Sequence, residues 1–246
     1  MTTIGYCTTE ADGRINDQMM WLHEGIRPQL TNMISELKEI APDVKVSGQL
    51  THCGNFSKVR KMQRLKRPLG PSRAFNMLGA PSGVPFAGAM TLQDIDYLIS
   101  TYVDAAKFMA SVGFDAAEIH FGHGYGLSQF ISPRTNKRTD EYGGSLENRV
   151  RLVREVLEDT KDAIGHDTAV AFRFAVDELM GENGMHAAEA EDIVGSLAEI
   201  PDLWDVNVAD WGNDSLPSRF GVEGAQADYI RFVKNLTTKP VVGVGR

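Results

Sequence analysis

AAEIHFGHGYGLSQFISPRTNKRTDEYGGSLENRVRLVREVLEDTKDAIGHDTAVAFRF, residues 116–174, contains the succession of elements that decides the fold. A short apolar run, Ala116–Phe121, opens the segment and a second one, Ala169–Phe174, closes it, as expected of buried strands. Between them lies an amphipathic helix that begins after Ser145, a good N-cap, and ends at Gly165. Because strands separated by a helix are typically parallel neighbours, the segment predicts a strand–helix–strand unit of a parallel sheet.

The same alternation extends along most of the chain. A further amphipathic helix is predicted from Leu92 to Ser111, where apolar residues recur on one face. About six strands are present where a closed barrel needs eight. We therefore predict an α/β fold with one domain over residues 1–246, a (β/α)8 TIM barrel that is incomplete at both ends and contains about strands 2 to 7. The predicted strands are residues 1–6, Val44–Leu50, Ala116–Phe121, Ala169–Phe174, Leu203–Ala209 and Pro240–Gly245.

Polar side chains gather where these strands end. In a (β/α)8 barrel the C-terminal strand ends meet on one face, which carries the active site. A doubly wound sheet also binds ligands at strand ends, but it usually carries a glycine fingerprint after its first strand, and this sequence has none. We therefore expect one pocket, surrounded by residues far apart in the sequence. The side chains at the strand ends are Gln49, His52, His120, His123, Arg173, Asp210, Trp211 and Arg246.

Composition excludes several classes of partner. A formal net charge of -8, from 25 Lys and Arg against 33 Asp and Glu, argues against a basic surface for nucleic acid or anionic lipid. Cys7 and Cys53 are the only cysteines, too few for a disulfide framework or for an iron–sulfur cluster held by this chain alone. No apolar run approaches the roughly 20 residues of a membrane helix, and no signal peptide is recognisable. We expect a cytoplasmic protein with no nucleic-acid or membrane partner.

The loop after the first strand of the quoted segment resembles a known signature. HFGHGYGLSQFISPRTNKRTDEYGGSLENRVRL, residues 120–152, is similar to that of the Old Yellow Enzyme superfamily of NADH:flavin oxidoreductases. GQLTHCGNFS around Gln49 and GVGR around Arg246 resemble two further motifs of the superfamily. WDVNVADWGNDSLPSRF, residues 204–220, resembles the branch of trimethylamine dehydrogenase and the demethylases of N-methyl amines. The likeness covers almost the whole chain and implies an FMN-binding TIM barrel.

The resemblance implies which residues hold FMN. Gln49 matches the side chain that hydrogen-bonds the pyrimidine edge of the flavin, and Arg173 matches the arginine beside N1 and the C2 carbonyl. Arg246 matches the phosphate contact. Cys7 is expected near the flavin without a covalent bond, since the covalent cysteine of the amine branch lies on an earlier strand. A glutamine or arginine at a strand end is also a common structural hydrogen-bonder, so only the ordered set supports this interpretation.

On the substrate side the resemblance points to two chemistries. In the ene-reductase branch the positions of His120 and His123 hold a carbonyl oxygen, and that of Tyr125 supplies a proton. Trimethylamine dehydrogenase has a tyrosine at the position of His120, so the substrate is left open.

The amine-binding residues of the other branch match Tyr6, Trp211 and Asp214, an aromatic wall and a carboxylate suited to an alkylated ammonium. A core tryptophan and a turn aspartate are the alternative interpretations of Trp211 and Asp214.

The sequence thus predicts an FMN-dependent oxidoreductase that transfers a hydride from an N-methylated or other amine to flavin N5, with His120, His123, Tyr125 and Asp214 as catalytic residues. One alternative is an NAD(P)H-dependent ene-reductase of the 2,4-dienoyl-CoA reductase type. Another is a metal-dependent hydrolase that uses His52 with the two histidines, and a third is a non-catalytic fragment. The resemblance also implies a small-molecule substrate and is compatible with a homo-oligomer. Any iron–sulfur cluster, and any site for NAD(P)H or FAD, is expected in C-terminal regions outside this chain.

Overall fold

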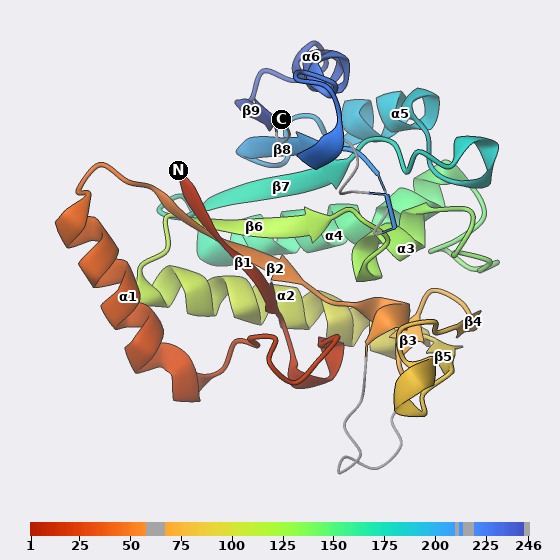
Figure 1. Cartoon of the computed structure of the whole chain (residues 1–246), viewed down its shortest axis with the longest axis horizontal. Helices are drawn as coiled ribbons and strands as arrows, with labels where there is room; N and C mark the ends of the chain where they lie inside the picture. The colour runs from red at the N-terminus through yellow and green to blue at the C-terminus, as the bar shows by residue number, and fades with distance from the viewer. Residues whose placement is uncertain (58–66, 210–211, 214–218, 244–246) are drawn as a thin grey trace.

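The computed structural model describes residues 1–57, 67–209, 212–213 and 219–243. Within these residues six strands form one sheet in which every neighbouring pair is parallel (Figure 1). The order of the strands in the sheet equals their order in the chain, so each crossover leads to the adjacent strand, as it does in a (β/α)8 barrel. The strands are β1 (Thr2–Thr8), β2 (Val46–Thr51), β6 (Ala116–Phe121), β7 (Ala169–Ala175), β8 (Leu203–Asn207) and β9 (Val241–Gly243).

Helices lie between consecutive strands and pack on one another in chain order, α1 on α2, α2 on α4, α4 on α5 and α5 on α6. This is the arrangement of an outer ring around a barrel wall, and it confirms the predicted α/β class. None of the described helices combines the length and the apolar character needed to cross a lipid bilayer. The helices are α1 (Arg27–Ile40), α2 (Leu92–Val112), α4 (Leu146–Ile164), α5 (Ala187–Leu197) and α6 (Ala227–Lys234).

Smaller elements follow two of the barrel strands, β2 and β6. A short sheet, β3 (Leu69–Gly70), β5 (Phe86–Ala89) and β4 (Ala74–Phe75), lies after β2 in the chain, and a short helix, α3 (Gly126–Ile131), follows β6. The sequence predicted only a loop in place of α3, because this single turn and a half carries no amphipathic period. The single-turn 3-10 helices are Ala11–Gly13, Glu24–Ile26, Gly54–Phe56, Ala80–Ser82 and Gly181–Asn183.

The two predicted helices end close to where their signals place them. Ser145 accepts a hydrogen bond from the backbone N–H of Asn148 and begins α4, and Gly165 ends it with a φ of 68°. The helix α2 ends one residue later than predicted, at Val112. Its start is fixed by Thr91 and Asp94, which exchange side chain-to-backbone hydrogen bonds.

Strand bounds differ from prediction by one or two residues. β2 begins at Val46 rather than Val44, and β8 ends at Asn207 rather than Ala209. Ala209 adopts a φ of 84°, a left-handed conformation that no strand accommodates. β9 is described as far as Gly243, and residues 244–246 of the predicted strand lie outside the described residues.

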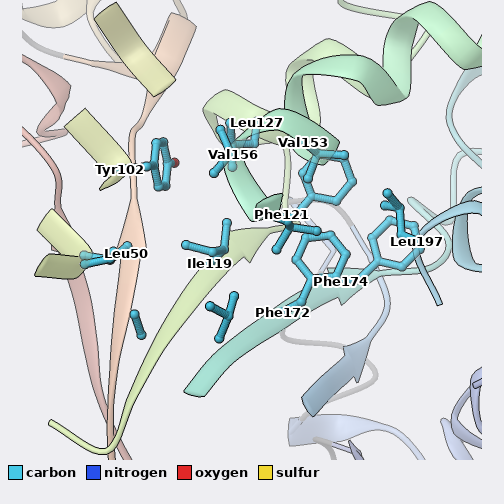
Figure 2. Packing of buried hydrophobic residues seen from close by; sticks show 14 of the residues in the cluster. Leu50, Tyr102, Ile119, Phe121, Leu127, Val153, Val156, Phe172, Phe174 and Leu197 are labelled. Atoms are coloured by element: carbon cyan, nitrogen blue, oxygen red, sulfur yellow. The ribbon is translucent and has the colours of Figure 1, made fainter. Parts of the chain in front are cut away.

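The two faces of the curved sheet have opposite character, as the period of two along a strand requires. On the outer face Phe121, Phe172 and Phe174 stack, with ring centroids 5.4 to 5.9 Å apart, and helices cover them (Figure 2). Trp204 meets Phe172 edge-on at 5.1 Å. The alternate positions face the barrel interior and carry polar residues such as Glu118, His120 and Arg173 together with small residues such as Ala171, so the apolar core lies between the sheet and the helices.

Polar side chains of the signature loop, residues 122–145, hold its shape. Gln129 donates to the carbonyl oxygens of Cys53 and Gly124 and accepts from the N–H of Asn55. Asn136 likewise donates to two carbonyl oxygens, those of Phe130 and Tyr142. The residues that make the motif recognisable therefore act largely on the backbone, and they fix the segment that follows β6.

Candidate active site

A cavity of about 500 Å³ opens at the C-terminal ends of β1, β2, β6 and β7. This volume is in the usual range for a small-molecule site. It brings together six side chains that the sequence analysis assigned to FMN or substrate, although 167 residues separate the first from the last (173 − 6). The lining residues are Thr3, Gly5, Tyr6, Gln49, His120, His123, Tyr125 and Arg173.

The contribution of β1 to the cavity depends on an irregularity in its pairing with β2. Ile4 pairs with Gly48 and Cys7 with Leu50, so Gly5 and Tyr6 stand opposite a single residue of β2. Such a bulge re-aims the side chains of the longer strand. Both Gly5 and Tyr6 line the cavity as a result.

Cys7 lies on the other side of the same bulge. Its side chain is fully buried in the apolar core and is not among the residues that line the cavity. Burial raises the pKa of the Cys7 thiol to about 12, so it is protonated at neutral pH. A neutral, enclosed thiol is suited to packing rather than to nucleophilic chemistry.

At the cavity, polar groups from four neighbouring strands interact across the barrel interior. Gln49 donates from Nε2 to Oε1 of the fully buried Glu118 at 2.6 Å. On the next two strands an Arg173 nitrogen lies 3.6 Å from an Asp205 oxygen. Burial and the nearby Asp205 charge raise the pKa of Glu118 to about 7. Burial also raises the pKa of Asp205, against the opposing effect of Arg173. We call these four residues the polar layer.

A chain of hydrogen bonds orders the two histidines. The amide nitrogen of Asn207 donates to Nε2 of His123 at 2.8 Å, and this assignment places the His123 proton on Nδ1. Nδ1 of His123 then donates to Nε2 of His120 at 3.0 Å, and Nδ1 of His120 donates to the hydroxyl of Thr51 at 3.3 Å. One tautomer of each ring satisfies the whole chain.

The backbone keeps the two rings close, and burial and local charge keep His120 neutral. His123 has a φ of 56°, a strained value for a residue other than glycine, of the kind that is often found at functional sites. Burial, then His123 and the positive charge of Arg173, holds the pKa of His120 well below its usual range. His120 is therefore a neutral hydrogen-bonding group that cannot serve as a cation at neutral pH.

Two tyrosines complete the wall of the cavity. The hydroxyls of Tyr6 and Tyr125 are 3.2 Å apart, and their rings are tilted at 5.5 Å. The Tyr125 ring also lies 5.3 Å from that of His120. Burial raises the pKa of Tyr6, so its hydroxyl stays protonated. These rings present both aromatic surface and hydroxyl groups to a ligand.

Other candidate residues lie elsewhere. Trp211, Asp214 and Arg246, like Asp210, fall outside the described residues. His52 does not join the histidine pair: it contacts Glu10 through Nε2 at 3.2 Å and accepts the Gly54 N–H through Nδ1. Among the described residues no group of three or more His, Cys, Asp or Glu side chains is arranged to hold a metal ion.

Four further residues of the site were not singled out in the sequence: Thr51, Glu118, Asp205 and Asn207. Their signal was present, since each is a polar residue in an apolar strand. Glu118 stands two residues before His120, and Asp205 stands two before Asn207, so each pair shares the inward face of its strand. Testing every strand for polar residues at a period of two would have found them.

The match to a protein family covers the whole chain. The family model of the NADH:flavin oxidoreductase / NADH oxidase family matches residues 1–246. This chain belongs to that family. Similar proteins and solved structures place it within the trimethylamine dehydrogenase branch of the Old Yellow Enzyme superfamily, as the motifs predicted, and they confirm the partial (β/α)8 barrel.

Several members of the NADH:flavin oxidoreductase family illustrate the likeness. Dimethylamine dehydrogenase from Hyphomicrobium sp. (strain x) is 38% identical over 184 residues, which are 72% of this chain and 25% of that protein. NADPH dehydrogenase from Clostridium acetobutylicum is 30% identical over 250 residues, covering 98% of this chain and 69% of that protein. The structure of histamine dehydrogenase from Rhizobium sp. 4-9 superposes with a TM-score of 0.87 at 36% identity, over 99% of this chain and 35% of that chain.

The chain therefore spans 25% of dimethylamine dehydrogenase and 35% of the histamine dehydrogenase chain. Membership of the NADH:flavin oxidoreductase family implies an oxidoreductase with FMN as its cofactor.

The residues around the cavity fit a flavin ring. Nε of Arg173 is buried, and no described residue accepts a hydrogen bond from it. The amide of Gln49 and the guanidinium of Arg173 are the donor and acceptor groups that the polar edge of the ring requires. A Cβ at Gly5 would lie 3.2 Å from Cβ of Gln49, so the glycine leaves this amide room beside β1.

Proposed function

We propose that this protein oxidises an N-methylated or other amine, with FMN as the acceptor of the hydride. FMN, when bound, supplies a two-electron acceptor at N5 of its ring. The observation that carries the proposal is that Gln49, His120 and Arg173 meet at one cavity beside two tyrosines. Similarity to dimethylamine dehydrogenase and histamine dehydrogenase supports an amine as the substrate. The resulting iminium would be hydrolysed by water to an aldehyde and a shorter amine.

In this proposal residues 1–246 form one FMN-binding barrel domain. Gln49 binds the pyrimidine edge of the ring, and Arg173 offsets negative charge at its N1 side. Arg246, outside the described residues, is assigned to the phosphate. An iron–sulfur cluster and a site for NAD(P)H or FAD, if the whole protein has them, belong to regions beyond this chain.

The proposed substrate pocket is formed by aromatic and neutral groups. Tyr6 contributes an aromatic face that attracts an alkylated ammonium, an interaction worth about 0.5 to 2 kcal/mol. Trp211 and Asp214, both outside the described residues, add a second aromatic face and a countercharge. His120, His123 and Tyr125 line the wall opposite the ring. A histidine kept neutral by burial suits this role, because an imidazolium would repel a cationic amine.

Anaerobic stopped-flow spectroscopy tests the proposal on the FMN-loaded protein. We expect dimethylamine, histamine or a related amine to bleach the flavin absorbance in a single turnover, and NADPH to leave it unchanged. Asp214→Asn should slow bleaching by the amine about tenfold or more, since it removes the charge partner of the substrate. Bleaching by NADPH and by none of the amines would reject an amine as the substrate.

A second candidate keeps the cofactor and reverses the electron flow. In an NAD(P)H-dependent ene-reductase of the 2,4-dienoyl-CoA reductase type, two neutral donors hold the carbonyl oxygen of a conjugated substrate. The presence of His120 and His123 on the cavity wall favours this candidate, which requires a ring N–H to turn from the hydrogen-bond chain to the substrate oxygen, and so does the similarity to NADPH dehydrogenase. The same stopped-flow experiment separates the two, because only the ene-reductase is reduced by NADPH.

A further inference from the structure

The polar layer contains two carboxylates that neither proposed reaction uses. Glu118 is fully buried and Asp205 is 5% exposed, and they flank Arg173 on β7, a partly exposed cation whose Nε is buried. Moving a carboxylate out of water into a protein interior is unfavourable unless partners compensate. Here compensation is incomplete: Oε2 of Glu118 and Oδ1 of Asp205 have no hydrogen-bond partner among the described residues.

The position of Glu118 determines the orientation of Gln49. An ionised carboxylate only accepts hydrogen bonds, so the amide must turn its nitrogen toward Glu118, as the 2.6 Å contact shows. The amide oxygen then lies on the side of Gly5, where a Cβ would be 3.5 Å from it, and Gly5 lines the cavity. Gln49 therefore offers an acceptor to the polar edge of a flavin ring, whose N3–H is a donor.

The net charge of the polar layer depends on the protonation of its two carboxylates. The groups that face Glu118 are the neutral amide of Gln49 on β2, Arg173 on β7 and Asp205 on β8. With both carboxylates ionised, the layer carries one net negative charge, and it becomes neutral when one carboxylate takes up a proton. Arg173 lines the cavity as well, so negative charge gained by a ring at that place competes with the carboxylates for the same cation.

We propose that Glu118 is a positioning residue toward FMN: it fixes the amide of Gln49 and takes up one proton from solvent when the ring gains negative charge beside Arg173. This inference rests on the proposed FMN-dependent function. The electron pair goes to the ring with the hydride. The proton bonds to a carboxylate oxygen of Glu118, and no bond of the protein breaks. The raised pKa of Glu118, about 7, means that this proton is taken up near neutral pH.

The test is the midpoint potential of the FMN-loaded protein against pH, measured by titration with dithionite beside a reference dye, which requires no amine. Above about pH 7, reduction should take up one extra proton. The equilibrium constant for reduction should then fall by a further factor of ten per pH unit, which lowers the midpoint potential by about 30 mV more per unit for two electrons. Glu118→Gln should abolish this steeper region and favour reduction about tenfold at pH 8. Ser47→Ala, a buried and uncharged neighbour on β2, should behave as wild type.

If Glu118→Gln does not bind FMN, a second measurement on the wild-type protein still tests the inference. The reduced-minus-oxidised infrared difference spectrum of the wild-type protein should show a carboxylate becoming a carboxylic acid at pH 7 to 8. Absence of this band, or loss of the steeper region in Asp205→Asn but not in Glu118→Gln, overturns the inference. A wild-type protein that holds no FMN overturns the proposed function with it. A protein that shows the steeper potential but is not bleached by amines rejects only the amine substrate.

Discussion

Single residues of the barrel interior divide into those that face the cavity and those that orient them. His120, Arg173 and Gln49 face the cavity, and each has a buried polar partner on a neighbouring strand. The cavity residues could be predicted because they occupy strand ends, where polar side chains are conspicuous. Their partners, such as Glu118, belong to none of the motifs. A period of two along the strand marks Glu118 as facing inward, but the residue that it contacts depends on the register between strands.

Glu118 should make stability depend on pH. Its pKa rises from an ordinary 4.5 to about 7 on folding, chiefly through burial, so the native state holds this proton more tightly than the unfolded state does. Its favourable contribution is complete below about pH 4.5 and is lost as pH rises through 7. Glu118→Gln does not titrate and keeps the hydrogen bond to Gln49. It should exceed the wild type in unfolding free energy by on the order of 3 kcal/mol at pH 8, and by far less at pH 4.

Urea unfolding of the protein freed of FMN, repeated across this pH range, measures the difference. Glu36→Gln, which changes an exposed carboxylate on α1, is the matched control and should stay within about 0.5 kcal/mol at every pH. If Glu118→Gln were the less stable variant at pH 8, Glu118 would have to be ionised without penalty in the native state.

Asn207 should determine which nitrogen of each histidine carries the proton. An aspartate at this position can only accept, so Asn207→Asp should draw the proton of His123 to Nε2 and reverse the direction of the bonds to His120 and Thr51. Reversal of a catalytic tautomer is costly, and we expect substrate turnover to fall by about tenfold or more. Nitrogen NMR of the ring atoms reports the tautomers directly. The exposed His166 is the internal reference, and unchanged tautomers in the variant would contradict the assignment.

At the level of elements, the signature loop is a structural connector between the sheet and the helices. Arg138 extends from this loop to the carbonyl oxygens of Pro71 and Met90, which directly follow β3 and β5 of the short sheet. Helices α2 and α4 could be predicted closely from their period and caps, because those signals are local. The short helix α3 and the bulge in β1 could not, since each depends on contacts with segments distant in the sequence.

Arg149 should be the residue of α4 on which the packing of three helices depends. It is 7% exposed, donates to the carbonyl oxygen of Ile131 at the end of α3, and forms an ion pair with Glu189 of α5. Arg149→Ala leaves that carboxylate and carbonyl without a partner, and the expected loss is about 3 to 5 kcal/mol of unfolding free energy. Arg154→Ala on the same helix is the control. Its pair with Glu158 is exposed, at 3.9 Å, and the expected effect is below about 0.5 kcal/mol.

Thermal and urea unfolding compare the two arginine variants at equal net charge. A similar small loss in both would mean that the buried ion pair contributes no more than an exposed one, and that α3, α4 and α5 are held together by apolar packing alone.

For the whole molecule, the barrel was predicted from the order in which strands and helices alternate along the chain, not from any one element. Short strands such as Ala116–Phe121 alternate with helices in the order that parallel neighbours require, and that order fixes which strand ends meet. A motif can then place residues 120 and 173 beside each other without knowledge of their contacts. The angle and depth at which side chains enter the cavity depend on packing between layers, and the sequence did not reveal them.

If the strand ends form one site, FMN binding should protect all of them from hydrogen exchange in solution. Hydrogen exchange compared with and without FMN should slow at residues 3–6, 49–54, 120–126 and 173–176, which come from four separate strands and lie at the cavity. Slowing of up to about a hundredfold is expected at FMN concentrations near a hundred times Kd. The opposite ends of three of these strands, around Lys45, Asp115 and Asp167, are the internal control and should change much less. Protection confined to one of the four segments would mean that the others do not share a ligand. Equal protection at both ends of the strands would mean that FMN stabilises the barrel as a whole without occupying this cavity.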